Sequence, residues 1–202
     1  MSFQTVIDNA SEISVERKAV VASTLARDGT YRAVNRGAQV WTFTVRLPDG
    51  PRWTDYRQTI SKIEQLDRFT AQTVQFNNTG HDWLFGYQGN SANITGFSAS
   101  WTRGSTTITL TASPSTPSGF KFRAGDIIQL GSGKVYTVAA DVSSASNTVT
   151  LHRPVLDATG SGVLQVAENC QFSVKCIEFP SWRLFERNQV GWSGAFVFIE
   201  VI

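Results

Sequence analysis

The chain has 202 residues, of which 41% are hydrophobic and 17% are charged, and its formal net charge is +2. Its Lys and Arg residues are scattered, which argues against the concentrated basic stripe of a nucleic-acid-binding protein. The sequence has no run of 18 apolar residues, so we expect no insertion into a membrane. The abundance of Gly, Ser and Thr favours β structure, and the length allows one large domain or two small ones.

The N-terminal residues, MSFQTVIDNASEISVERK, contain no basic leader followed by an apolar run, so we expect synthesis in a reducing cytoplasm. Cys170 and Cys176 flank or lie in a strand-like segment. Six strand residues span roughly 20 Å, which is too far for a disulfide unless the chain bends. We therefore expect both cysteines to serve as small apolar side chains.

The first part of the chain predicts strands. Residues 12–25 are rich in β-branched side chains, and a turn follows at 27–29. Within residues 37–48, large apolar side chains alternate with polar ones, which predicts an amphipathic strand. Two prolines and a glycine end this strand at 48–51.

One helix is predicted, over residues 54–68. Apolar residues recur there at spacings of three and four, which places them on one face: Trp53, Tyr56, Ile60, Ile63, Leu66 and Phe69. Thr54 is the expected N-cap, and Asp55 suits the positive end of the helix dipole. Two further strands are expected at 73–78 and 81–89, separated by a turn.

The composition changes between residues 94 and 166, where Ser, Thr and Gly replace helix-forming residues. Short strands separated by turn residues are predicted at 106–111, 126–130, 134–140, 147–153 and 163–166. Several short strands with alternating apolar residues predict a small closed barrel of the OB-like kind, because closure removes exposed strand edges.

Two long alternating strands, at 171–179 and 194–201, end the chain. We therefore predict a mainly β protein with two domains. A core domain, 1–93 and 167–202, is expected to be a β-sandwich or split barrel with one α-helix, and 94–166 is expected to be an inserted OB-like barrel. The alternative is a single elongated β-sandwich.

The sequence gives little indication of catalysis. His81 lies at a predicted turn and His152 at the end of a predicted strand, and no known nucleophile, zinc or phosphate-binding motif is present. A catalytic carboxylate pair would have to come from residues such as Asp126, Asp141 and Asp157, which all stand at predicted turns or strand ends. We expect no enzymatic activity, no cofactor and no metal.

Two groups of aromatic residues are candidates for binding. In the predicted barrel, Trp101 and Tyr136 are the candidates for contact with a sugar, with packing inside the barrel as the alternative. In segment 179–194, aromatic and arginine residues of the kind favoured at protein interfaces occur together: Trp182, Arg183, Phe185, Arg187 and Trp192. The alternative for this segment is a loop folded over its own core.

The order of these segments resembles the distal tail proteins of long-tailed bacteriophages, in the form that carries an inserted OB-fold domain. The resemblance rests on AQVWTFTVRLP and WTDYRQTISKIEQL within residues 38–69, and on FRAGDIIQLGSGKVYTVAADV at 122–142. It also covers NTVTLHRPVL and the two closing strands. The first 35 residues contain no matching motif.

The resemblance implies a structural protein of the virion, assembled in the host cytoplasm and located at the tail tip. Its core domain would form a ring, typically a hexamer, that joins the tail tube protein to the tail hub and the receptor-binding or side-fibre proteins. The inserted barrel would project as a docking module or contact host surface carbohydrate. The alternatives are a carbohydrate-binding module of a virion protein and a baseplate component of a contractile tail.

Overall fold

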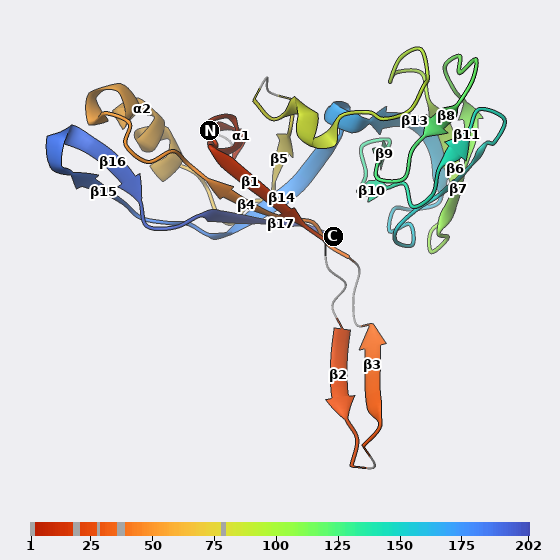
Figure 1. The fold of residues 1–202 in the computed structure, drawn as a ribbon, viewed down its shortest axis with the longest axis horizontal. Helices are drawn as coiled ribbons and strands as arrows, with labels where there is room; N and C mark the ends of the chain where they lie inside the picture. The colour runs from red at the N-terminus through yellow and green to blue at the C-terminus, as the bar shows by residue number, and fades with distance from the viewer. Residues whose placement is uncertain (1–2, 18–20, 28, 36–38, 78–79) are drawn as a thin grey trace. The chain divides into compact units, whose positions relative to one another are not determined.

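The computed structural model of the chain describes residues 3–17, 21–27, 29–35, 39–77 and 80–202 (Figure 1). The helical elements are α1 (Gln4–Asp8), α2 (Trp53–Glu64) and the 3-10 segments η1 (Asp82–Phe85), η2 (Ala167–Asn169) and η3 (Glu186–Asn188). The strands are β1 (Glu12–Glu16), β2 (Val21–Leu25), β3 (Tyr31–Asn35), β4 (Thr42–Arg46), β5 (Gln72–Gln75), β6 (Ser98–Trp101), β7 (Thr107–Ala112), β8 (Phe120–Phe122), β9 (Ile127–Leu130), β10 (Val135–Thr137), β11 (Val142–Ser143), β12 (Thr148–Thr150), β13 (Gly160–Val166), β14 (Gln171–Glu178), β15 (Trp182–Phe185), β16 (Gln189–Trp192) and β17 (Phe196–Glu200). The predicted class, mainly β with one main α-helix, is confirmed.

The chain divides into two compact units. The core unit comprises Met1–Gln72 and Val174–Val201, and the barrel unit is formed by Thr73–Ser173. The predicted insertion, 94–166, lies inside the barrel unit, whose boundaries fall earlier and later in the chain. The residues before position 94 belong to this unit because their backbone is bonded to it. The Asn90 amide donates to the Phe120 carbonyl over 2.7 Å, and the Gln88 amide donates to Asp126 over 2.9 Å.

Four neighbouring strands, in the order β1-β4-β17-β14, organise the core unit. Phe43 and Val45 of β4 and Phe196 and Phe198 of β17 are buried on one face of this sheet, as their alternation with less buried residues predicts. Phe3, just before α1, packs against Phe198 with a ring-centroid distance of 5.1 Å. α1 in turn contacts α2, so this apolar face is the core of the unit (Figure 1).

The apolar face predicted for the main helix is largely confirmed. Tyr56, Ile60 and Ile63 are buried along α2, and Leu66 is buried just beyond its end. Burial raises the pKa of the Tyr56 phenol to about 12, so this side chain is uncharged at neutral pH. The helix therefore contributes to the core through a single stripe of side chains.

Both ends of the predicted helix need correction. The helix begins at Trp53, so Thr54 lies inside it and is not the N-cap. It ends at Glu64, and Phe69 is 90% exposed. The cause is a turn in which the Asp67 carboxylate accepts a hydrogen bond from the Phe69 amide over 2.8 Å and redirects the chain.

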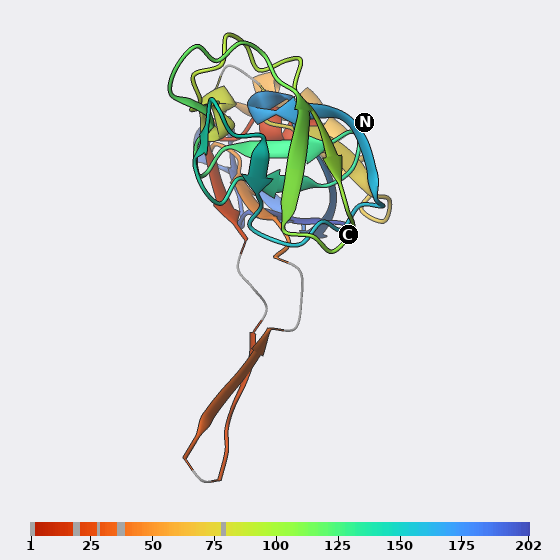
Figure 2. The same cartoon turned by 90° about the vertical axis from the view of Figure 1, so that its right-hand side faces the viewer.

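The barrel unit contains a six-stranded sheet in the order β10-β9-β13-β6-β7-β12. Its two outer strands are joined beyond β10 and β12: the Ala139 amide donates to the Thr150 carbonyl over 2.8 Å, and the His152 amide donates to the Thr137 carbonyl over 3.0 Å. These bonds close the sheet on itself, so the barrel has no fully open edge. Figure 2, in which this unit faces the viewer, shows its short strands crossing around a common centre.

The barrel has its own hydrophobic core. Every barrel strand contributes buried side chains, among them Phe122, Ile128, Tyr136, Val149 and Leu164. The alternation predicted for the strands is seen in β7, where Ile108 and Leu110 are buried between exposed threonines.

The strands predicted within residues 12–25 are confirmed by β1 and β2, and β2 pairs with β3 in a hairpin. The predicted strand at 81–89 is wrong: η1 forms there, because the Leu84 amide bonds to the His81 carbonyl over 3.1 Å instead of to a neighbouring strand. Finally, α1 was not predicted by its sequence, since five residues are too few to show a helical period.

Candidate functional site

The segment around 181–192, expected to be a loop, is an antiparallel hairpin of β15 and β16. Its second strand is bonded to the chain just before α2. The Val190 amide donates to the Pro51 carbonyl over 2.9 Å, and the Gly50 amide donates to the Val190 carbonyl over 2.8 Å. The Asp49 carboxylate accepts from the Trp192 amide over 2.9 Å. These bonds fix the hairpin beside the start of α2.

Two tryptophans join the hairpin to the helix. Trp182 of β15 stacks on Trp53 of α2, with ring centroids 4.9 Å apart and planes at 20°. The indole N–H of Trp182 donates to Oε1 of Glu64 over 2.7 Å. A short hydrogen bond to a carboxylate is stronger than one between neutral groups, so it fixes the orientation of the indole.

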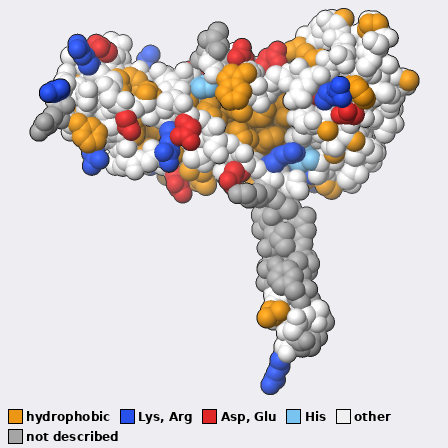
Figure 3. Space-filling view, viewed as in Figure 1, with side chains coloured by type: hydrophobic (Ala, Val, Ile, Leu, Met, Phe, Trp, Pro, Cys, Tyr) orange, Lys and Arg blue, Asp and Glu red, His pale blue; other side chains and the backbone are white. Residues whose placement is uncertain are grey.

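Beyond this stack, the hairpin exposes hydrophobic side chains. Leu184 is 50% exposed and Phe185 is 46% exposed. The Arg183 guanidinium lies 4.6 Å from the centroid of the Phe185 ring, at the distance of a cation–π contact. Figure 3 shows basic and hydrophobic side chains together at the end of the core unit that carries α2, β15 and β16.

The tip of the hairpin has an unusual backbone. Arg187 and Asn188 have φ values of +64° and +63°, in the left-handed region. Two successive residues in this region match the right-handed twist of a tight hairpin, although Arg is disfavoured there. Gly191 is required for a different reason, because a Cβ at this position would lie 2.2 Å from the Phe185 ring. The close approach of Phe185 to the opposite strand holds its ring in place.

Two shallow pockets lie beside the stacked tryptophans. One, of about 520 Å³, is lined by Trp182 together with Glu64, Arg68 and residues 179–181. The other, of about 490 Å³, is lined by Trp53, Gln58, Ser61 and two basic side chains, Arg57 and Lys62. We call the hairpin and the adjoining start of α2 the hairpin platform; it comprises Trp53, Arg57, Lys62, Trp182 and Leu184, with Arg183 and Phe185 on the other face of β15.

The structure brings together four of the five predicted interface residues but excludes one. Trp182, Arg183, Phe185 and Arg187 all lie on the hairpin, with Arg187 exposed at its tip. Trp192 is only 9% exposed and packs against Phe196, with ring centroids 5.3 Å apart. It is a core residue because β16 turns this face toward the sheet, and it is not an interface anchor.

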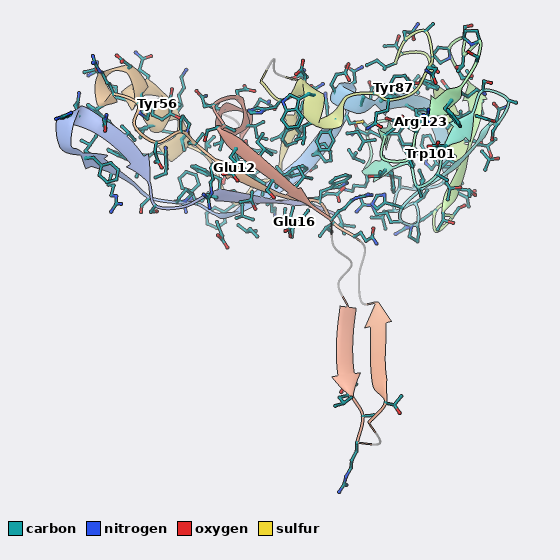
Figure 4. All side chains as sticks on the ribbon, viewed as in Figure 1. Glu12, Glu16, Tyr56, Tyr87, Trp101 and Arg123 are labelled. Carbon is teal, nitrogen blue, oxygen red and sulfur yellow. The ribbon has the colours of Figure 1, made fainter. Side chains whose placement is uncertain are left out.

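Tyr136, one of the two sugar-contact candidates, is likewise wrongly assigned. It is fully buried in the barrel core, and its hydroxyl donates to Oδ2 of Asp157 over 2.6 Å while accepting from the Leu156 amide over 2.8 Å. Burial, assisted by the Asp157 carboxylate, raises the pKa of the phenol above its usual range. The other candidate, Trp101, is partly exposed and borders a groove on the barrel unit (Figure 4).

The three candidate carboxylates have structural partners. Asp126 is buried and accepts hydrogen bonds from the Gln88 and Arg123 amides over 2.9 and 2.8 Å. Burial nevertheless raises the pKa of its carboxyl. Asp141 pairs with Arg123 over 3.0 Å, and the Ala124 amide and the Arg123 side chain lower its pKa. Asp157 binds Tyr136, so the three aspartates hold turns and the barrel core.

The histidines and cysteines are also placed within the fold. His81 precedes η1, and Nδ1 of His152 accepts from the Thr137 amide over 2.8 Å. Both cysteines are buried free thiols; burial raises the pKa of Cys176 to about 11 and that of Cys170 further. Among the residues that the structure describes, no group of three or more His, Cys, Asp and Glu side chains is arranged to bind a metal ion.

No family model matches the chain, and no curated protein matches it. Across the described residues, no helix has the length and apolar character needed to cross a membrane. The hairpin platform, which sequence reasoning reached through its Trp and Arg content, is the best-developed candidate site. The contribution of Trp53 to it was missed, because a residue at the first turn of an amphipathic helix is expected in the core.

Proposed function

We propose that this chain is a structural protein of a bacteriophage tail tip and that its core unit associates with further copies into a closed ring. The observation that carries the proposal is the hairpin platform, where β15 exposes Leu184 on the same face as a fixed pair of tryptophans and Phe185 on the other face. Trp and Arg are enriched in the residues that dominate binding energy at protein interfaces. The assignment to a tail tip rests on the resemblance of residues 38–69 and 122–142 to distal tail proteins.

The core unit carries basic side chains on one part of its surface and acidic side chains on another. The pocket beside Trp53 is lined by Arg57 and Lys62 and by no acidic side chain. At the outer edge of the sheet, β1 carries the exposed carboxylates Glu12 and Glu16, labelled in Figure 4, and Arg46 of β4 lies 3.8 Å from Glu12. Contact between two different patches of identical subunits is heterologous, and it closes into a ring when the rotation between subunits divides a full turn. We propose that the platform of one copy faces the β1 edge of the next.

In this function the protein would act through its interfaces and not through catalysis. The ring, expected to be a hexamer, would be part of the virion and would contact the tail tube protein on one side. The tail hub and the receptor-binding or side-fibre proteins would be its other partners. The involvement of its aspartates in turns and core hydrogen bonds supports a structural role.

The proposal is tested by negative-stain electron microscopy and mass photometry of the full chain. We expect rings in the wild type and their loss in Leu184→Asp, because a charge on the platform would be buried in the contact without a partner. A double charge reversal, Arg57→Glu with Lys62→Glu, should also break the ring. Glu12→Lys with Glu16→Lys should restore it in that background.

Arg103→Glu is the control, because it reverses one basic charge at an exposed position of the barrel unit. It should leave the ring intact. A wild type that stays monomeric at tens of micromolar would contradict the ring. Rings that persist in Leu184→Asp would place the interface elsewhere.

A further inference from the structure

The 3-10 segments η1 and η2 contact each other in the barrel unit and border one pocket of about 580 Å³. Its lining consists of two carboxylates, two aromatic residues, an amide and a glycine: Asp82, Glu168, Trp83, Tyr87, Asn77 and Gly86. None of these residues is basic. The volume lies in the range of sites for small molecules, so the chemistry of the lining indicates which ligand it suits.

Trp83 presents a large apolar surface at this pocket, because its side chain is 74% exposed. The indole N–H donates to the Gly80 carbonyl over 3.1 Å, and the backbone amide donates to the Asp82 carboxylate over 2.9 Å. Phe85 attaches η1 to the unit by packing on buried Phe172, with ring centroids 5.5 Å apart. The Trp83 ring is therefore held in place while most of its surface remains open to a ligand.

Tyr87, labelled in Figure 4, is the second aromatic residue of the pocket and is also fixed. Its hydroxyl donates to the Lys121 carbonyl and accepts from the Ser91 amide over 3.3 Å. Its ring packs edge-on against Phe122 of the barrel core, with centroids 6.2 Å apart. Two rings that are already ordered can pack against an alkyl chain with little further loss of side-chain entropy.

The two carboxylates of the pocket come from different segments. Asp82 lies in η1, and Glu168 lies in η2, where its carbonyl accepts from Nε2 of Gln75 over 2.9 Å. No ion pair joins either carboxylate to a basic side chain of the residues that the structure describes. A carboxylate offers about four acceptor sites, so each can accept hydrogen bonds from an ammonium group of a ligand. An adjacent aromatic face stabilises such a cation further.

We propose that this pocket binds a linear alkyl diamine or polyamine. One ammonium group pairs with Asp82 and another with Glu168, and the methylene chain between them packs on Trp83 and Tyr87. A monoamine would neutralise only one of the two carboxylates, and an anion would be repelled by both. A divalent metal ion is disfavoured, because no group of three or more His, Cys, Asp and Glu side chains is arranged to hold one among the described residues.

The test is isothermal titration calorimetry of the full chain with putrescine, cadaverine and spermidine, at low ionic strength because salt screens exposed charges. We expect at least one of them to bind with a Kd of about 1 mM or tighter. Butylamine is the matched probe, because it carries an alkyl chain with a single ammonium group. It should bind at least about threefold more weakly than the best diamine or polyamine, since it forms one ion pair fewer.

Variants of the pocket separate the two kinds of contact. Glu168→Gln and Asp82→Asn each remove one charge with little change of shape, and each should weaken binding of the best probe at least about threefold. Trp83→Ala should weaken it by a similar factor, and Trp83→Phe should weaken it less because a ring remains. Glu178→Gln is the matched control, because it makes the same charge change at an exposed position of the core unit, and it should bind as the wild type does. Circular dichroism checks that each variant is folded, and Glu168→Gln decides the question if Trp83→Ala is not.

Four outcomes would overturn the proposal. Failure of all three diamine and polyamine probes to bind at about 10 mM would show that the pocket does not take them. Equal binding of butylamine would assign the pocket to a single ammonium group, such as a lysine side chain of a protein. Mg²⁺ that binds as tightly as the best probe, with the same loss in Glu168→Gln, would show attraction by charge alone. Binding that survives all the pocket variants would place the site elsewhere. The ring proposed for the core unit is tested by separate variants, so either proposal can fail alone.

Discussion

The stack of Trp53 on Trp182 should make the hairpin and α2 open together. An aromatic pair in this geometry contributes about 1 kcal/mol, and the hydrogen bond from Trp182 to Glu64, at a partly exposed site, adds about 1 kcal/mol. Trp182→Ala should therefore lower the free energy of opening of the hairpin by about 2 kcal/mol. Trp182→Phe keeps an aromatic ring and should lower it by about 1 kcal/mol.

Native-state hydrogen exchange of the Val190 amide measures this free energy, because the amide is bonded to the Pro51 carbonyl and must open to exchange. A loss of 2 kcal/mol corresponds to exchange about 30-fold faster. The amide of Leu151, bonded within the barrel unit, is the internal control and should be unchanged. Leu184→Ala is the control variant and should have little effect, because Leu184 is half exposed.

A double-mutant cycle separates the stack from other effects. Trp53→Ala and Trp182→Ala should show a coupling free energy of about 1 kcal/mol, because each removes the same contact. A coupling close to zero would refute the assignment of the stack as the link between helix and hairpin. Val190 exchange that Trp182→Ala leaves unchanged would refute the reasoning altogether.

Three further predictions concern the interior. Tyr136→Phe should lower the stability of the barrel unit by about 1–3 kcal/mol, seen by calorimetry, because it leaves Asp157 without its 2.6 Å donor; an unchanged melting temperature would contradict this. Gly133→Ala should destabilise the same unit by about 1–3 kcal/mol, measured by urea unfolding, because its Cβ would lie 2.2 Å from Asp157 Oδ1; a stability equal to that of the wild type would show that Asp157 can move. Cys176, with its pKa raised to about 11, remains a protonated thiol below that pH, so it and the more deeply buried Cys170 should not react with Ellman's reagent at pH 8 until the protein is unfolded; rapid labelling of native protein would show that they are accessible.

Local patterns in the sequence were sufficient to predict the main helix and the long strands. The three- and four-residue spacing of apolar side chains located α2 and its buried residues Tyr56, Ile60 and Ile63. Alternation located β4 and β17, because a strand buried on one face shows a period of two whatever it pairs with. Turn residues and repeated short strands were enough to predict a barrel.

Local patterns failed where a short-range hydrogen bond competes with a regular element. The turn at Asp67 ends the helix before Phe69, which has the right spacing but is exposed. In η1, bonding from Leu84 to His81 replaces the strand that the apolar residues favoured. Composition alone cannot show which of these local alternatives has the lower free energy.

The candidate sites depended on tertiary structure more than the helices and strands did. Composition indicated an interface in segment 179–194, but Trp182 and Trp192 are paired across the hairpin, and only their tertiary neighbours separate them: Trp182 stacks on Trp53, whereas Trp192 packs on Phe196 and is 9% exposed. The stack of Trp182 on Trp53 joins residues far apart in the chain, and no local period encodes such a contact. Likewise, Trp101 and Tyr136 were equivalent as aromatic residues in predicted strands. Closure of the barrel placed Tyr136 inside it and left Trp101 at a groove, because a residue's exposure is set by which strands meet around it.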